Sequence, residues 1–175
     1  MVEYVLAMSD VHPACRPNDE LLADCDERHE RRSGPGGQHR NKVATAVVLT
    51  HRPTGLRAEA NERRSQAENR AEAVRRLRVR LALEVRSAVA HAGPSPLWRS
   101  RVVVGRMAIN PAHSDFPSLL AEALDAVAAA EFEVAAAARS LGVSTSQLAR
   151  FLQHEPPAWA LVNECRRQRG LRPLK

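Results

Sequence analysis

The chain has 175 residues, of which 44% are hydrophobic and 3% aromatic, and its formal net charge is +6. This length fits one domain or two small ones, and the apolar content suffices for small packed cores. No apolar run reaches the roughly 18 residues of a transmembrane helix, so we expect no membrane span. The first ten residues resemble neither a signal peptide nor a transit peptide.

The cysteines are few and widely spaced, at Cys15, Cys25 and Cys165. An odd, sparse set argues against a disulfide framework and fits a reducing compartment, so we predict a cytoplasmic protein. The one conceivable metal site has a spacing that matches no structural zinc pattern; it would use His12, Cys15, Cys25 and His29. We therefore predict neither a metal nor another cofactor.

Charge is distributed unevenly along the chain. Residues 1–26 carry one arginine and six acids, residues 27–88 fifteen Lys and Arg against seven acids, and residues 89–175 ten against seven. A basic middle segment suits a polyanionic partner such as RNA. An ordinary solvated helix face has the same composition, so charge alone leaves both interpretations open.

The first quarter of the chain is predicted to form a short helix, a strand and a loop. Residues 1–16 hold few signals and are expected to be poorly ordered. Pro17–Leu22 predicts a helix start, with Asn18 or Asp19 as its cap and an end near Cys25. Residues 27–32 predict a strand. The run from Arg32 to Lys42 (RSGPGGQHRNK) has three glycines and a proline within four positions, which predicts an exposed loop.

A hairpin and a long helix are predicted next. Residues 43–50 are rich in β-branched residues, residues 51–55 contain Pro and Gly, and residues 56–60 follow as a second strand. Ser65 and Glu68 form a capping box that starts an Arg-rich helix to about Val89. Its apolar positions step by three or four and predict a face on the sheet, hence an α+β fold; they are Ala67, Ala71, Val74, Leu77, Leu81 and Val85. Arg80 and Arg86 are expected either to contact rRNA or to be solvated.

The rest of the chain is predicted to be mainly helical. We expect domains at 17–90 and 118–175, joined by a linker over 91–117, in which Val102–Val104 is ambiguous between strand and loop. Ser118 is expected to cap a helix over 119–130. Helices over 133–140 and 145–152 resemble a helix-turn-helix, with Gly142 in the turn and Ser144 as the cap.

The sequence does not decide which partner the helix-turn-helix-like pair binds. Its second helix carries one cation, Arg150, which makes sequence-specific DNA reading the weaker alternative and docking to the ribosome or a protein the stronger. A last helix begins at Pro156 and ends in a basic tail that includes Arg166 and Arg167.

The glycine-rich loop holds the most informative residue, Gln38, next to Gly36 and Gly37. Cations surround this amide and suggest presentation to an anionic partner: Arg31 and Arg32 before it, and His39, Arg40 and Lys42 after it. A lone Gly-Gly-Gln tripeptide is more often an ordinary surface turn. Two further motifs follow, however: THRPTG over residues 50–55 and RSQ-x-x-N over residues 64–69.

Together, in this order and spacing, the three motifs resemble the catalytic domain of class I peptide-chain release factors. They also resemble the small ribosome-rescue hydrolases built on that domain, which act without a stop codon. The resemblance covers roughly residues 21–86, about a third of the chain. It implies partners in the ribosome, its rRNA and peptidyl-tRNA, and hydrolysis of the peptidyl-tRNA ester.

The resemblance also implies a division of labour at the loop. The Gln38 backbone N–H would face the oxyanion and its side chain the water, while Gly36 and Gly37 permit the backbone conformation. Further RNA contacts are predicted at seven cations and one imidazole: Arg32, His39, Arg40, Lys42, Arg76, Arg80, Arg166 and Arg167. The matching glutamine of the family is subject to N-methylation, and the sequence leaves the state of Gln38 open.

The departures from the family favour one role. Few residues precede Leu21, and the tail does not resemble the stop-codon-reading domains, so we expect codon-independent ribosome rescue. The final basic run is poor in lysine, which leaves anchoring in the mRNA channel open and allows for a protein partner. Two alternatives remain: a non-catalytic ribosome- or RNA-binding protein, and a DNA-binding regulator that uses the helix-turn-helix-like pair.

Overall fold

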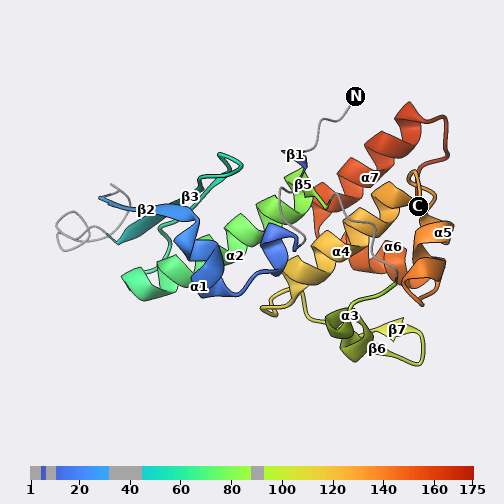
Figure 1. Cartoon of the computed structure of the whole chain (residues 1–175), viewed down its shortest axis with the longest axis horizontal. Coiled ribbons are helices and arrows are strands. Elements are labelled where there is room, and N and C mark those ends of the chain that lie inside the picture. Colours follow the sequence, from blue (N-terminus) through green and yellow to red (C-terminus); the bar gives the residue numbers. More distant parts are fainter. Residues whose placement is uncertain (1–4, 7–10, 32–44, 88–92) are drawn as a thin grey trace. The chain divides into compact units, whose positions relative to one another are not determined.

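The computed structural model describes residues 5–6, 11–31, 45–87 and 93–175. Its internal contacts divide the chain into two compact units. Residues 13–81 form the first, here called the sheet unit, and residues 1–12 with 82–175 form the second, the helical unit. Figure 1 shows their elements, which confirm the predicted α+β class.

The sheet unit contains a three-stranded antiparallel sheet. It begins with a short 3₁₀ turn, Pro13–Cys15, and α1 (Asn18–Ala23). The strands are β2 (Cys25–Glu30), β3 (Ala46–His51) and β4 (Arg57–Ala60), in the spatial order β2-β3-β4. The central strand β3 is the most apolar, and Val47 and Leu49 are fully buried. Its pairing with β2 runs from Cys25↔His51 to Glu30↔Ala46.

The helix α2 (Gln66–Glu84) lies along this sheet (Figure 1). Ser65 starts it as predicted, since its Oγ accepts a hydrogen bond from Glu68 N at 3.4 Å. The buried face differs from the expected one in the first turns, because Ala67 and Ala71 are exposed. Asn69, Ala73 and Leu77, spaced four apart, are fully buried in their place.

The helical unit has its core among helices. Its elements are α3 (Pro96–Arg101), β6 (Val102–Val103), β7 (Arg106–Met107), α4 (Phe116–Ala129), α5 (Val134–Ser140), α6 (Thr145–Gln153) and α7 (Pro156–Gln168). Trp98, Phe116 and Phe151 pack together, with ring centroids 5.7 and 5.4 Å apart. The Trp98 indole donates a hydrogen bond to Leu141 O at 2.9 Å. α3 and the β6–β7 pair lie within the segment predicted as a linker.

A two-residue parallel pairing changes the expected end of the long helix. β1 (Val5–Leu6) pairs with β5 (Val85–Arg86), in the register Val5↔Val85. The helix therefore ends at Glu84 rather than near Val89, and residues 5–6 are a strand although 1–16 were expected to be poorly ordered. Because the two partners lie about 80 positions apart, no local pattern announces the pairing.

Three predictions about single residues were wrong. Neither Asn18 nor Asp19 caps α1, because Pro17 occupies the N-cap position. Ser118 lies inside α4 and is buried, while the helix starts at Phe116 after Asp115. Arg86 is buried and donates to the carbonyl of Ala82 at 2.8 Å, so it is neither a solvated cation nor a surface contact for rRNA.

Candidate functional site

The predicted catalytic residues Gly36, Gly37 and Gln38 lie outside the described residues, as do Arg32, His39, Arg40 and Lys42. The structure does place both strands that carry this segment. β2 ends at Glu30 and β3 begins at Ala46, and these two residues are paired opposite each other. The two chain ends of residues 31–45 are therefore neighbours on adjacent strands.

The first half of α2 is bonded to the outgoing strand β2. The Gln66 side-chain amide donates to His29 Nδ1. One turn further on, Arg70 Nε donates to both carboxylate oxygens of Glu27, at 3.0 and 2.9 Å. His29 Nε2 also lies 3.2 Å from Glu27 Oε1. Two side chains four residues apart on the helix thus hold the strand that leads to residue 31.

Asn69 is bonded to the returning strand. Its Nδ2 donates to Thr45 O at 2.7 Å and to Arg63 O at 2.9 Å, and its Oδ1 accepts from Arg63 N at 2.9 Å. The side chain is fully buried, so these bonds satisfy polar groups that water does not reach. In the sequence, Asn69 stands out only as a member of the RSQ-x-x-N motif. Its place in a four-residue series with Ala73 and Leu77 was the signal that it faces inward.

The motif over residues 50–55 forms the turn between β3 and β4. Gly55 adopts φ +71°, a conformation that favours glycine, and its N–H donates to His51 O at 2.8 Å. His51 is buried, which lowers the pKa of its imidazole, and its Nδ1 lies 2.8 Å from Thr54 Oγ1. Arg52 donates to Cys25 O at 2.9 Å. This motif therefore ties the hairpin turn to the start of β2.

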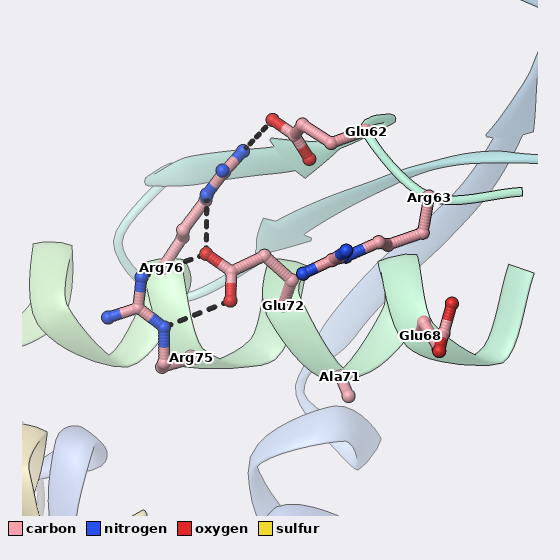
Figure 2. Close-up of a pocket in the computed structure, with 7 residues that line it drawn as sticks. All are labelled: Glu62, Arg63, Glu68, Ala71, Glu72, Arg75 and Arg76. Carbon is pink, nitrogen blue, oxygen red and sulfur yellow. Dashed lines mark hydrogen bonds and ion pairs between the residues drawn. The ribbon is translucent and has the colours of Figure 1, made fainter. Parts of the chain in front are cut away.

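The predicted RNA contact Arg76 is engaged inside the sheet unit. It donates to Glu62 Oε1 at 2.8 Å, to Glu72 Oε1 at 2.9 Å and to the backbone carbonyl of Glu59 at 2.8 Å. Arg75 makes two further bonds to Glu72, at 3.0 and 2.8 Å. Figure 2 shows these side chains along an open groove of about 670 Å³ on α2.

Arginines hold two carboxylates of this groove, those of Glu62 and Glu72, in their ionised form. The hydrogen bond from Arg76 lowers the pKa of Glu62 below its ordinary value. The hydrogen bond from Arg75, helped by the charge of Arg76, does the same for Glu72. Three acids and three arginines line the groove together with Ala71, so it is not a uniformly basic surface.

The other three described arginines that were predicted to contact RNA differ in burial and in hydrogen bonding. Arg80 is exposed and donates to Arg57 O at 2.6 Å. Arg166 is buried, and its guanidinium donates to Phe132 O and to Arg172 O, the latter at 2.8 Å. Arg167 is exposed and pairs with Glu164 at 2.5 Å. The segment after α7 folds back on that helix, where Leu174 N donates to Asn163 Oδ1 at 2.7 Å.

Within the described residues, no group of three or more His, Cys, Asp or Glu side chains could hold a metal ion. None of the described helices combines the length and apolar character needed to cross a membrane.

Comparison with known proteins relates residues 22–95, which include most of the sheet unit, to a protein family. Residues 22–95 match the model of the RF-1 domain. Peptide chain release factor 1 of Acidiphilium cryptum and that of Gluconacetobacter diazotrophicus are each 42% identical over 97 residues, which is 54% of this chain and 27% of the relative. Peptide chain release factor 1 of Streptococcus pyogenes is 44% identical over 69 residues, 37% of this chain and 19% of the relative.

The chain spans about a quarter of the length of the first of these relatives. The matched segment begins inside α1 and includes the sheet, the glycine-rich run and all of α2. The helices α4 to α7 lie beyond its end at residue 95. Residues 22–95 therefore belong to the RF-1 domain family of class I peptide chain release factors, as the three sequence motifs implied.

Proposed function

We propose that this protein hydrolyses the ester bond of peptidyl-tRNA on the ribosome. The observation that carries the proposal is the RF-1 domain match over residues 22–95, within which Gly36, Gly37 and Gln38 are all present. The pairing of Glu30 with Ala46 supports it, because the two strands that flank residues 31–45 are neighbours in one sheet. A loop on a rigid pair of strands suits a group that must enter a distant site.

The proposed chemistry needs an oriented water and stabilisation of the oxyanion. The Gln38 side chain orients the water, and its backbone N–H faces the developing oxyanion. One such donor contributes on the order of 10²–10³ in rate. The ribosome and the tRNA complete the geometry, so the protein is an enzyme only within that complex. This places it in the cytoplasm, where ribosomes translate.

We further propose that release is independent of the codon and serves ribosome rescue. The RF-1 match ends at residue 95, and α3, the β6–β7 pair and the helices α4 to α7 follow it. In this proposal the helical unit takes over docking to the ribosome. Among the predicted RNA contacts, Arg80 and Arg167 have the exposure that a phosphate contact needs, while Arg76 and Arg166 support the protein's own structure.

The decisive variant is Gln38→Ala. It keeps the glycines and the surrounding cations, so binding should survive while release falls, with residual activity from the backbone donor. The measurement is single-turnover peptide release, at saturating protein, from ribosomes that carry peptidyl-tRNA with and without a stop codon in the A site. Equal rates for the wild type and Gln38→Ala would refute the catalytic role of the loop.

The same assay separates the proposed role from its alternatives. Rescue predicts release with an empty A site and no dependence on the stop codon, whereas termination predicts release only with the codon present. Binding by the wild type without any release would instead support a non-catalytic ribosome-binding protein.

A further inference from the structure

The helices α5 and α6 form a helix-turn-helix unit with a well-defined turn. Gly142 has φ +69°, and its neighbour Val143 donates to Ala138 O at 3.0 Å. Ser144 caps α6, since its Oγ accepts from Gln147 N at 3.2 Å. Leu148, Phe151 and Leu152 are buried, so one side of α6 belongs to the core of the helical unit and the opposite side faces solvent.

A groove of about 310 Å³ runs along this solvent-facing side. It lies between α6 and the end of the chain, and its lining residues are Thr145, Ser146, Ala149, Arg150, Gln153, Leu174 and Lys175. The hydrogen bond between Leu174 N and Asn163 Oδ1 fixes the second wall on α7. We call this feature the α6 groove.

The side chains that line the α6 groove carry positive charge and no negative charge. It offers two hydroxyls, one amide, one guanidinium and one ammonium, and no Asp or Glu side chain lines it. The helix α6 itself contains no acid. Within the described ranges, neither Arg150 nor Lys175 forms an ion pair with an acid. The groove on α2 contrasts with it, because two of its arginines, Arg75 and Arg76, are already paired with Glu72 and Glu62.

We propose that the α6 groove binds the sugar–phosphate backbone of ribosomal RNA. Cationic side chains neutralise phosphates, and hydroxyl and amide side chains hydrogen-bond to backbone oxygens. Ribose 2′-hydroxyls, which DNA lacks, are additional partners for Ser146 and Gln153. The groove thus presents the chemistry of both parts of an RNA backbone.

RNA is preferred over DNA for two reasons. Reading base edges in a DNA major groove relies on several bidentate side chains, most often arginine or lysine on guanine, and Arg150 is the single cation of α6. In addition, the same chain carries an RF-1 domain, so the choice of ribosomal RNA rests on the proposed function. This groove would supply the docking that the helical unit needs on the ribosome.

The test compares two double variants of the full chain with equal charge loss. Arg150→Gln/Lys175→Gln empties the α6 groove of cations. Arg99→Gln/Arg106→Gln removes two exposed cations elsewhere in the helical unit. Fluorescence anisotropy measures binding of a labelled RNA hairpin and of a DNA hairpin of the same sequence over a range of salt concentrations. Equal melting temperatures verify that the surface changes leave the fold intact.

We expect the groove variant to weaken RNA binding and to flatten its salt dependence by about 0.7–0.9 in slope per lost phosphate contact, with a smaller effect from the control variant. Ser146→Ala/Gln153→Ala should weaken binding of RNA more than of DNA. Equal effects of the groove and control variants would overturn the site. Loss confined to the DNA hairpin would overturn the choice of RNA.

A release assay on stalled ribosomes separates this inference from the proposed function. The groove variant should raise the protein concentration needed for half-maximal release and leave the maximal rate unchanged. If the wild type releases no peptide but the groove variant still loses RNA binding, the proposed function fails and the RNA site stands. If release is normal and the groove variant binds RNA and ribosomes like the wild type, the site fails alone.

Discussion

At the scale of single residues, burial separates side chains that look alike in the sequence. Arg80 and Arg166 are both cations of predicted RNA-binding segments, yet Arg166 is buried and bonded to backbone carbonyls while Arg80 is exposed. Cys25 is buried, which raises the pKa of its thiol to about 11 and keeps it protonated at neutral pH. Asn69 is a fully buried polar residue of the sheet unit that bonds to the backbone of Thr45 and Arg63.

We predict that Asn69→Ala destabilises the protein strongly. The change removes the three hydrogen bonds of a fully buried amide, to Thr45 O, Arg63 O and Arg63 N, at a cost on the order of 3 kcal/mol. The control Gln66→Ala removes an exposed hydrogen bond three residues earlier and should cost under about 1 kcal/mol. Urea unfolding of both variants measures the difference. An Asn69→Ala protein as stable as the control would contradict the role of these buried bonds.

At the scale of elements, α2 is held to the strands by polar contacts along its exposed edges. Arg70 reaches Glu27 on β2, and Arg76 reaches the backbone of Glu59 on β4. The arginines that lie off the apolar face are therefore part of the fold, whatever their contribution to RNA binding. Long arginine side chains suit this role, because they span the distance from helix to sheet with several donors.

The pH dependence of the Arg76 network follows from this arrangement. The pKa of Glu62 is lowered in the folded state, so the stabilisation is present above the ordinary pKa of 4.5 and is lost as the pH falls through the lowered value. Arg76→Gln should therefore lower the free energy of unfolding at pH 7. The difference in this free energy between the variant and the wild type should be smaller at about pH 3.5. Urea unfolding at both pH values measures this.

Glu62→Gln provides the matched variant for the same network. Because it removes the titrating carboxylate, it should lower stability at neutral pH and approach the wild type in acid. The difference in unfolding free energy between the wild type and Arg76→Gln could instead stay constant or grow toward pH 3.5. That result would show that the ion pair between Arg76 and Glu62 does not stabilise the fold.

At the scale of the whole molecule, the chain combines a family domain with a second folded unit. The sheet unit carries the proposed chemistry, and the helical unit has its own core around Trp98, Phe116 and Phe151. A second unit with its own core is suited to docking, because it can evolve a binding surface without disturbing the loop.

The helical unit is expected to behave as a folded body in solution. Amide exchange should show protected stretches over residues 119–130, which extend to the C-cap of α4, and over residues 145–152, which lie in α6. Protection there should persist in Asn69→Ala, since that residue belongs to the other unit. Uniformly fast exchange over both stretches would mean that this part of the chain is not stably folded.

The sequence by itself determined the features that depend on neighbouring residues. In the sheet unit these are the β3–β4 hairpin with its turn at Gly55 and the start of α2 after Ser65. In the helical unit they are the turn at Gly142 and the cap at Ser144. The motifs also determined the membership of residues 22–95 in the RF-1 domain family. Each rests on turn, cap or motif chemistry that acts within a few positions. The role of Gln38 stays a prediction, since it lies outside the described residues.

Only the tertiary structure decided which polar residues are buried and where α2 ends. The pairing of β5 with residues 5–6 stops the helix at Glu84, and contact with Thr45 makes Asn69 a core residue. Arg86 is buried close to Asp125, and the α6 groove exists because the end of the chain returns to α7. All these contacts join separate segments of the chain, and their strength depends on burial, which a spacing such as that of Asn69, Ala73 and Leu77 indicates but does not determine.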